Sequence, residues 1–181
     1  MTRRVVIVTI ILFFFITPVS WSQAKGLDNP PSPGLTTIII VRHAEKDTMK
    51  NDPPLTQRGK ERAAFLAGML RSSGIAAIYT TQFNRTRETV RPLAESLGIK
   101  PQVLTIYSDS IKEHVASLAR EIFMQHTGGV VLVSGHSNVI PLLLKELGVK
   151  DGIALRDDEY DNVFIVTAKI GGEASLLRLR Y

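Results

Sequence analysis

From residue 36 onward, short runs of β-branched residues alternate with longer stretches of helical periodicity, and this alternation constrains the fold more than any other feature. The first run, Thr36–Val41, is β-branched at every position, which is typical of a strand buried on both faces of a sheet. Strand–helix alternation of this kind predicts a mainly parallel central sheet. We therefore expect an α/β domain with helices on both faces of the sheet, a three-layer sandwich.

The same pattern places the individual elements. It predicts strands over residues 36–41, 76–80, 103–106 and 130–133. It predicts helices over about 56–71, 84–97 and 138–147, and a further helix that starts at 111 and is ended by Gly128-Gly129. Two further strand patterns, at 163–168 and 174–180, flank Gly171-Gly172, which favours a hairpin at the end of the chain.

The composition excludes several classes of protein. The 181 residues, 44% of them hydrophobic, suit one domain with a buried core. The absence of cysteine rules out a disulfide scaffold, a thiolate zinc site, an iron–sulfur cluster and a cysteine nucleophile. The net charge of +5 is scattered rather than gathered into a basic stripe, so we expect no nucleic-acid partner.

The N-terminus has the pattern of a targeting segment. Arg3 and Arg4 precede an apolar run that extends through Val19, and small residues follow at positions 22 and 24. This pattern predicts a secretory signal peptide and an exported protein, periplasmic or extracellular. If the segment stays uncleaved it becomes a membrane anchor, and this is the one membrane contact that we expect. The expected division is a signal peptide at 1–24, an irregular leader at 25–35 and a domain at 36–181.

Three polar clusters lie where predicted strands end or the following helices begin: Arg42–Lys46, Asn84–Thr89 and Ser134–Asn138. Ligands of such sheets bind outside the carboxyl ends of the strands. Arginine guanidinium groups match phosphate oxygens, and the N-termini of helices attract the same anion. Two histidines and two arginines at these positions therefore predict a phosphate-binding site.

These clusters, with one further segment, resemble the motifs of the histidine phosphatase superfamily, also called the phosphoglycerate mutase-like family. Arg42–Lys46 resembles the Arg-His-Gly/Ala signature, and Leu55–Gly59 resembles the Leu-Thr-x-x-Gly element that follows it. Arg85–Thr89 resembles the second-arginine motif, and Gly135–Ser137 resembles the second-histidine motif. The segments come in the family's order, from about Thr36 to the C-terminus, and imply a phosphoglycerate mutase-like fold.

The resemblance implies roles for particular side chains. His43 would be the nucleophile, and Arg42, Arg85 and His136 would complete the phosphate pocket. Arg85 rather than Arg87 matches the motif, because it lies four residues before the threonine that ends it. A nucleophilic imidazole must be neutral, and two neighbouring arginines lower the pKa of His43 in the required direction.

Other parts of the site are expected from their position. Lys46 and Ser137 are candidates for substrate contact. We expect no metal and no cofactor, because the sequence has no His-Glu-x-x-His motif and no carboxylate cluster at ligand spacing. The general acid that an alcohol leaving group needs is left open. The candidates are Asp109 and Glu45, and the acidic run Asp157–Glu159 is a further possibility.

Two other classes of protein were weighed against this one. Gly135–Val139 is close to the nucleophile elbow of an α/β-hydrolase, but that class needs a histidine after the serine, and none follows Ser137. A non-catalytic phosphate-binding module is the second class. His43 argues against it, because binding alone needs the arginines more than a second neutral imidazole. The sequence thus predicts an exported, metal-independent phosphatase with a phosphohistidine intermediate, acting on a phosphomonoester or a phosphorylated macromolecule. The alternatives are a non-catalytic phosphate or sugar-phosphate binding module and a phosphomutase of the same family.

Overall fold

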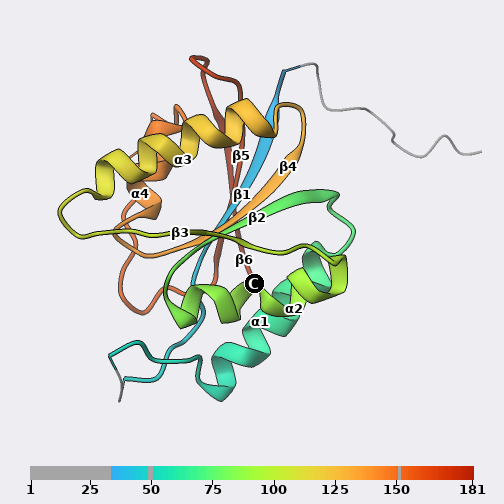
Figure 1. Ribbon diagram of the computed structural model, residues 1–181, viewed down its shortest axis with the longest axis vertical. Coiled ribbons are helices and arrows are strands. Elements are labelled where there is room, and N and C mark those ends of the chain that lie inside the picture. Colours follow the sequence, from blue (N-terminus) through green and yellow to red (C-terminus); the bar gives the residue numbers. More distant parts are fainter. Residues whose placement is uncertain (1–33, 49–50, 151) are drawn as a thin grey trace, which may run out of the picture.

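A computed structural model describes residues 34–48, 51–150 and 152–181. They form one six-stranded sheet with a pair of helices on each face (Figure 1). The predicted signal peptide and most of the predicted leader lie outside the described residues. No helix in the described part of the chain is both long and apolar enough to span a bilayer.

The sheet is parallel at its centre and antiparallel at one side. Its strands are β1 (Thr36–Arg42), β2 (Ile75–Thr81), β3 (Gln102–Leu104), β4 (Val130–Gly135), β5 (Asn162–Ala168) and β6 (Ser175–Arg180). They are ordered β3-β2-β4-β1-β5-β6 across the sheet. The pairs β3–β2, β2–β4 and β4–β1 are parallel, whereas β5 runs antiparallel to both β1 and β6. The carboxyl ends of β2, β4 and β1 therefore meet at one edge.

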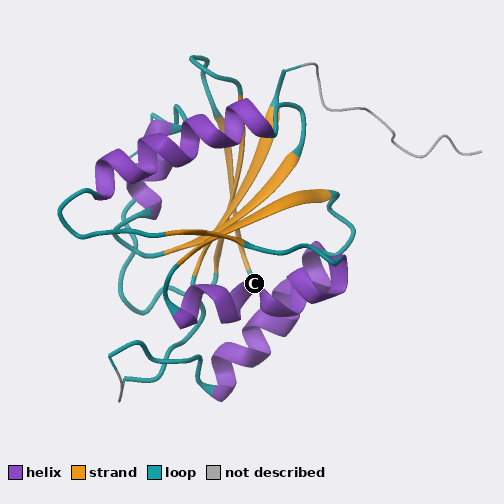
Figure 2. Ribbon diagram, viewed as in Figure 1, coloured by secondary structure: helices purple, strands orange, loops and turns teal. Residues whose placement is uncertain are grey.

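The helices complete the two outer layers, as Figure 2 shows. The helices α1 (Gln57–Leu70) and α2 (Asn84–Leu97) pack on one face, and α3 (Ile111–Gln125) and α4 (Ile140–Glu146) pack on the other. Side chains of β1 alternate between the two cores. Ile38 and Ile40 belong to the core under α3 and α4, whereas Ile39 and Val41 belong to the core under α1 and α2. This explains why the strand is apolar at every position from Ile38 to Val41.

The predicted three-layer α/β fold is confirmed, and every predicted strand and helix is present. Several boundaries shift by one or more residues, and the structure shows a local reason for two of these shifts. β3 ends at Leu104 because both backbone groups of Ile106 bond to the side-chain amide of Gln82 instead of continuing the ladder. α4 begins at Ile140 rather than 138, because the residues after β4 first form a turn in which Val139 N donates to His136 O.

Candidate active site

The register between β1 and β4 brings the two motif histidines together. Arg42, the last residue of β1, pairs with Gly135, the last residue of β4. His43 N then donates to Gly135 O at 3.0 Å, so His43 and His136 occupy equivalent positions just beyond two parallel strands. Their ring centroids are 5.4 Å apart, and both residues are buried, with exposed fractions of 3% and 8%.

His43 has its nucleophilic nitrogen available. Its Nδ1 lies 2.8 Å from the carbonyl oxygen of Ala44, which can only accept, so Nδ1 carries the proton and Nε2 carries the lone pair. Burial is the main cause that lowers the pKa of His43, to about 4, and the charges of Arg42, Arg85 and Lys46 act in the same direction. The neutral ring was expected from the arginines alone, but burial is the larger cause.

The backbone of the loop before β5 holds the guanidinium of Arg42. Arg42 Nη1 donates to the carbonyl oxygens of Arg156 at 2.9 Å, Asp157 at 3.0 Å and Glu159 at 3.4 Å. The guanidinium carbon lies 4.3 Å from the centre of the Tyr160 ring, a cation–π contact. With Nη1 satisfied in this way, Nε of Arg42 is buried and has no hydrogen-bond partner among the described residues.

Arg85 enters the same pocket from the first turn of α2. Its guanidinium carbon stacks 4.2 Å from the centre of the Phe83 ring. Asp52 caps this turn from another loop, accepting from Asn84 N at 3.0 Å, and its carboxylate lies 3.7 Å from Arg85 Nη1. Within the described part of the chain Nε of Arg85 is also buried without a hydrogen-bond partner. Two guanidinium groups at one site give the pocket a positive charge that suits an anion.

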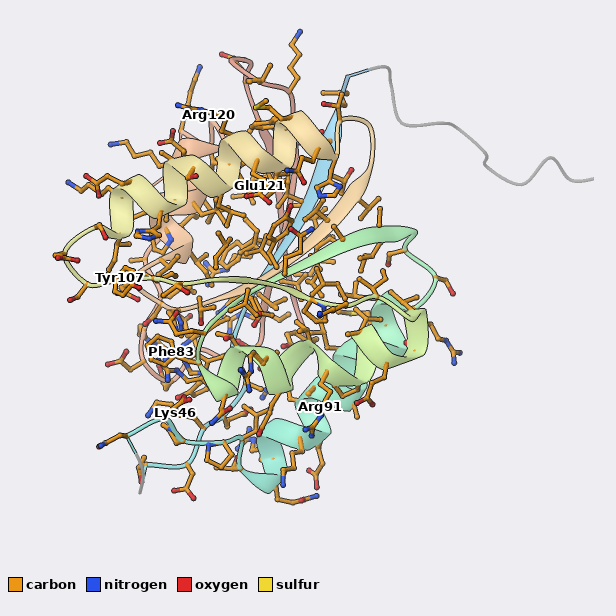
Figure 3. The ribbon with its side chains drawn as sticks, in the orientation of Figure 1. Lys46, Phe83, Arg91, Tyr107, Arg120 and Glu121 are labelled. Atoms are coloured by element: carbon orange, nitrogen blue, oxygen red, sulfur yellow. The ribbon has the colours of Figure 1, made fainter. Side chains whose placement is uncertain are left out.

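These side chains line a pocket of about 380 Å³. Its polar lining includes both motif histidines and both motif arginines, as well as Lys46, Ser108, Ser137, Asn138 and Asp157. Its apolar lining consists of Phe83, Ile106, Ile111 and Val139. In Figure 3, Lys46 and Phe83 lie at the edge of the sheet where β1 and β2 end. The pocket can hold a phosphate group between the arginines with a larger substituent against the apolar wall.

His136 is the second neutral imidazole of the pocket. Its Nε2 lies 2.9 Å from Thr81 Oγ1, at the end of β2. Burial lowers the pKa of His136 to about 3, with further lowering by the charges of Arg85, His43 and Arg42. The two arginines can neutralise a dianionic phosphate group. The uncharged imidazole of His43 can attack it directly, because no proton has to be removed from the attacking nitrogen first.

Several residues that support the site were not found from the sequence. Thr89 Oγ1 accepts from Ala44 N at 2.9 Å and donates to Arg85 O at 2.7 Å, which ties the His43 loop to α2. Glu88 accepts from Leu55 N at 2.8 Å and fixes the next loop to the same helix. Both residues lie in the Arg85–Thr89 segment, which the sequence indicates as functional because of its arginine. Their capacity to form hydrogen bonds is the property from which their supporting role could have been predicted.

The remaining predicted residues fall into two groups. Lys46 and Ser137, the candidates for substrate contact, line the pocket, whereas Arg87 lies outside it and donates to Asn84 Oδ1 at 3.2 Å. Glu45 also lies away from the pocket, contrary to its candidacy as the acid. Its carboxylate accepts from Arg62 Nε at 2.9 Å and from Arg62 Nη2 at 2.8 Å. Burial by itself raises the pKa of Glu45, but the hydrogen bonds and charge of Arg62 outweigh it, so the pKa is lowered and the group stays ionised.

The other acid candidates are also poorly placed. Asp109 is exposed and does not line the pocket, although its neighbour Ser108 does. Asp158 pairs with Arg156, and Glu159 pairs with Arg178 and Arg180. Asp157 is the one carboxylate on the pocket wall among the described residues. Nor do residues 34–48, 51–150 and 152–181 contain any group of three histidines, cysteines or acids suited to hold a metal.

The sheet, parallel at its centre, carries two histidines and two arginines beyond the carboxyl ends of its strands, an arrangement that suits an anionic ligand. Residues 38–106 match the model of the histidine phosphatase superfamily, branch 1, so the chain is similar to this family over that segment. This match spans three of the four motifs and confirms the resemblance.

Individual proteins show the same likeness. A probable phosphatase of Schizosaccharomyces pombe is 32% identical over 85 residues, which are 43% of this chain and 39% of that protein. The probable phosphoglycerate mutase GpmB of Yersinia enterocolitica is 33% identical over 70 residues, covering 35% of this chain and 33% of that protein. The chain thus spans well under half of the length of these relatives.

Solved structures share the fold at low sequence identity. Mycobacterial hydrolase 1 superposes with a TM-score of 0.65 at 15% identity, over 81% of this chain and 99% of that one. The protein histidine phosphatase SixA, complexed with tungstate, superposes with a TM-score of 0.62 at 16% identity, over 80% of this chain and 96% of that one. These superpositions confirm the phosphoglycerate mutase-like fold.

Proposed function

We propose that this protein is a phosphatase that works through a phosphohistidine on His43. The observation that carries the proposal is the convergence on one pocket of His43, whose Nε2 is free, with the guanidinium groups of Arg42 and Arg85. The similarity to a protein named as a phosphatase supports the same conclusion. The substrate class that we propose is a phosphomonoester or a phosphorylated macromolecule.

The geometry supports a two-step reaction. In the first step His43 Nε2 bonds to phosphorus, the bond from phosphorus to the leaving oxygen breaks, and that oxygen departs with the electron pair. Arg42 and Arg85 neutralise the equatorial oxygens as charge shifts onto them. In the second step water bonds to phosphorus, the phosphorus–nitrogen bond breaks, and the electron pair returns to Nε2. Since the residues themselves supply the nucleophile and the positive charge, we propose that neither step needs a metal.

The first test is phosphate release from an aryl phosphate in the presence of a metal chelator. An aryl leaving group needs little protonation, so an absent general acid does not hide the activity. We expect His43→Ala to lose at least about a thousandfold in kcat/KM, because the nucleophile is removed. His114→Ala is the matched control. The ring of His114 bonds Ser110 O on α3 outside the pocket, and this variant should keep full activity.

Other outcomes separate the alternatives. Equal turnover by the wild type and His43→Ala would overturn the mechanism. Inactivity of both, with phosphate still raising the melting temperature, would point to a non-catalytic binding module. Transfer of the phosphoryl group to an added alcohol in preference to water would point to the phosphomutase alternative, as the likeness to GpmB suggests.

We also propose that the protein is exported. The proposal rests on the basic, apolar and small-residue pattern of the first 24 residues. Intact-mass measurement of the protein expressed with its full sequence should find a chain that begins at Lys25. A full-length chain retained with membranes would support the anchored alternative.

A further inference from the structure

A chain of hydroxyl groups links His136 to the backbone. His136 Nε2 lies 2.9 Å from Thr81 Oγ1, and Thr81 Oγ1 lies 2.8 Å from Thr86 Oγ1. Thr86 Oγ1 in turn lies 2.8 Å from Phe83 O and 3.2 Å from Thr81 O. Thr81 and Thr86 are both buried, with exposed fractions of 3% and 0%. Water therefore cannot replace these bonds.

The direction of the chain follows from counting protons. A carbonyl oxygen only accepts, so Thr86 spends its single hydroxyl proton on Phe83 O or Thr81 O. In the contact between the two hydroxyls, Thr81 must then be the donor. Having used its own proton, Thr81 Oγ1 can only accept from His136, so the proton of the neutral His136 ring lies on Nε2.

The two pocket histidines are thus neutral in opposite tautomers. The proton of His43 lies on Nδ1, held by Ala44 O, and its free nitrogen is Nε2. The proton of His136 lies on Nε2, and its free nitrogen is Nδ1. Nδ1 of His136 has no hydrogen-bond partner among the described residues, and the ring lines the pocket 5.4 Å from that of His43. The lone pair on Nε2 of His43 suits attack on phosphorus, and the lone pair on Nδ1 of His136 is then available to accept a proton.

We propose that Thr81 and Thr86 form a hydroxyl relay that positions His136, and that His136 Nδ1 accepts the proton of the water that hydrolyses the phosphohistidine. This inference rests on the proposed function. In this step the water oxygen bonds to phosphorus, the bond from phosphorus to His43 Nε2 breaks, and its electron pair returns to that nitrogen. One water proton goes to His136 Nδ1, and the other stays on the phosphate.

The surroundings suit this role. The carboxylate of Glu45 is locked by Arg62, so it does not compete as the base. Burial lowers the pKa of His136, and the charges of Arg85, His43 and Arg42 lower it further, so the ring is neutral when the water approaches and holds an accepted proton only weakly. Asp157 is the rival base, because it lies on the pocket wall. His136 and the relay form one unit, so their removal should affect the same step.

The test separates formation of the phosphoenzyme from its decay. Full-length enzyme is mixed with an aryl phosphate in a rapid-quench instrument, and phosphohistidine is trapped in alkali at a series of times. We expect His136→Asn to slow decay about a hundredfold or more, as for loss of a general base. Thr81→Val keeps the side-chain volume but removes the acceptor, and we expect decay to slow at least tenfold while the phosphoenzyme accumulates. Thr81→Ser restores the hydroxyl and should restore decay.

Thr86→Val tests the direction of the relay. This variant leaves the Thr81–His136 contact but frees the Thr81 proton to donate to Nε2, which would move the His136 proton onto Nδ1. We expect slower decay of the phosphoenzyme and a nitrogen-15 chemical shift of the His136 ring that reports the changed tautomer. Thermal unfolding of each variant shows whether the fold is retained.

The outcomes distinguish this inference from the proposed function. Unchanged decay in both Thr81→Val and His136→Asn would overturn the inference, as would accumulation of phosphoenzyme in Asp157→Asn alone. If Thr81→Val unfolds, the nitrogen-15 shifts of Thr86→Val decide, and a wild-type tautomer there would also overturn it. Absence of any phosphoenzyme in the wild type, together with turnover by His43→Ala, would instead overturn the proposed function.

Discussion

At the scale of single residues, burial controls the charge of the two pocket histidines. It lowers the pKa of His43 to about 4 and that of His136 to about 3, whereas the unfolded chain regains the ordinary value near 6.5. Between pH 6.5 and about 4 the unfolded state therefore binds protons that the folded state does not. The free energy of unfolding should fall across this window as the pH is lowered.

We expect the loss to be on the order of 2–3 kcal/mol per histidine between pH 6.5 and 4.5, since one pH unit corresponds to about 1.4 kcal/mol. Urea unfolding at several pH values measures it. Carboxylates contribute to the same window, so the comparison is with a His43→Gln, His136→Gln double variant. This variant should show a distinctly flatter pH dependence, and an identical slope would contradict the assignment of buried neutral rings.

The residues that carry formal chemistry were predictable, and the residues that only form hydrogen bonds were not. His43, Arg42, Arg85 and His136 could be identified because they gather where predicted strands end or a helix begins, and because their segments resemble the motifs of one family. Thr81 and Thr86 could not be identified from the sequence. A threonine at the end of a strand or in the first turn of a helix is common without any function. The role of Glu45 was mistaken because its partner Arg62 lies on α1, and the spacing between them shows no contact.

At the scale of elements, the start of α1 has to approach the loop after β1 very closely. Thr56 caps α1 by accepting from Gly59 N, and the Thr56 N–H donates to Glu45 O at 2.9 Å. A β-carbon at Gly59 would lie 2.2 Å from Glu45 O, a backbone atom two residues after His43. The glycine of the Leu-Thr-x-x-Gly element is therefore needed for contact between backbones.

Gly59→Ala should accordingly destabilise the protein by about 1–3 kcal/mol, as for other forced overpacking, and should lower kcat by displacing the His43 loop. Gly68→Ala is the matched control in the same helix, because a β-carbon there meets nothing within 4 Å. That substitution should stabilise by up to about 1 kcal/mol through helix propensity. Thermal unfolding and aryl phosphate turnover check both variants. Equal effects on stability would contradict the close approach.

The elements themselves were predictable because their periodicities are strong, but some of their ends were not. Each shifted end coincides with a bond that no periodicity encodes. Gln82 captures the backbone of Ile106 and ends β3, and the turn at His136 delays α4. The order of the strands was also beyond the sequence pattern, because parallel pairing joins residues far apart in the chain.

At the scale of the whole molecule, occupation of the pocket should stabilise the fold. Arg42 connects β1 to the loop before β5, and Arg85 connects α2 to the residues around Asp52. An anion that pairs with both guanidinium groups would therefore join distant parts of the chain. Inorganic phosphate at a hundred times its dissociation constant should add about 2.7 kcal/mol to the free energy of unfolding.

Melting temperatures with phosphate and with chloride at equal ionic strength measure this effect. Arg85→Ala should abolish the difference between the two salts, because it removes one of the two donors. Arg87→Ala removes a neighbouring, exposed arginine that does not line the pocket, and it should leave the difference intact. Equal shifts in the two variants would show that phosphate acts on general surface charge.

The way in which Arg42 is held also bears on how this chain can diverge from its relatives. The hydrogen bonds that hold the guanidinium go to main-chain oxygens of residues 156, 157 and 159, so they depend on the path of the backbone rather than on which side chains those three residues carry. Substitutions can accumulate there without loss of the contact. The match to the family ends at residue 106, before this loop. In this loop, related proteins should therefore agree more closely in the path of the backbone than in amino-acid sequence.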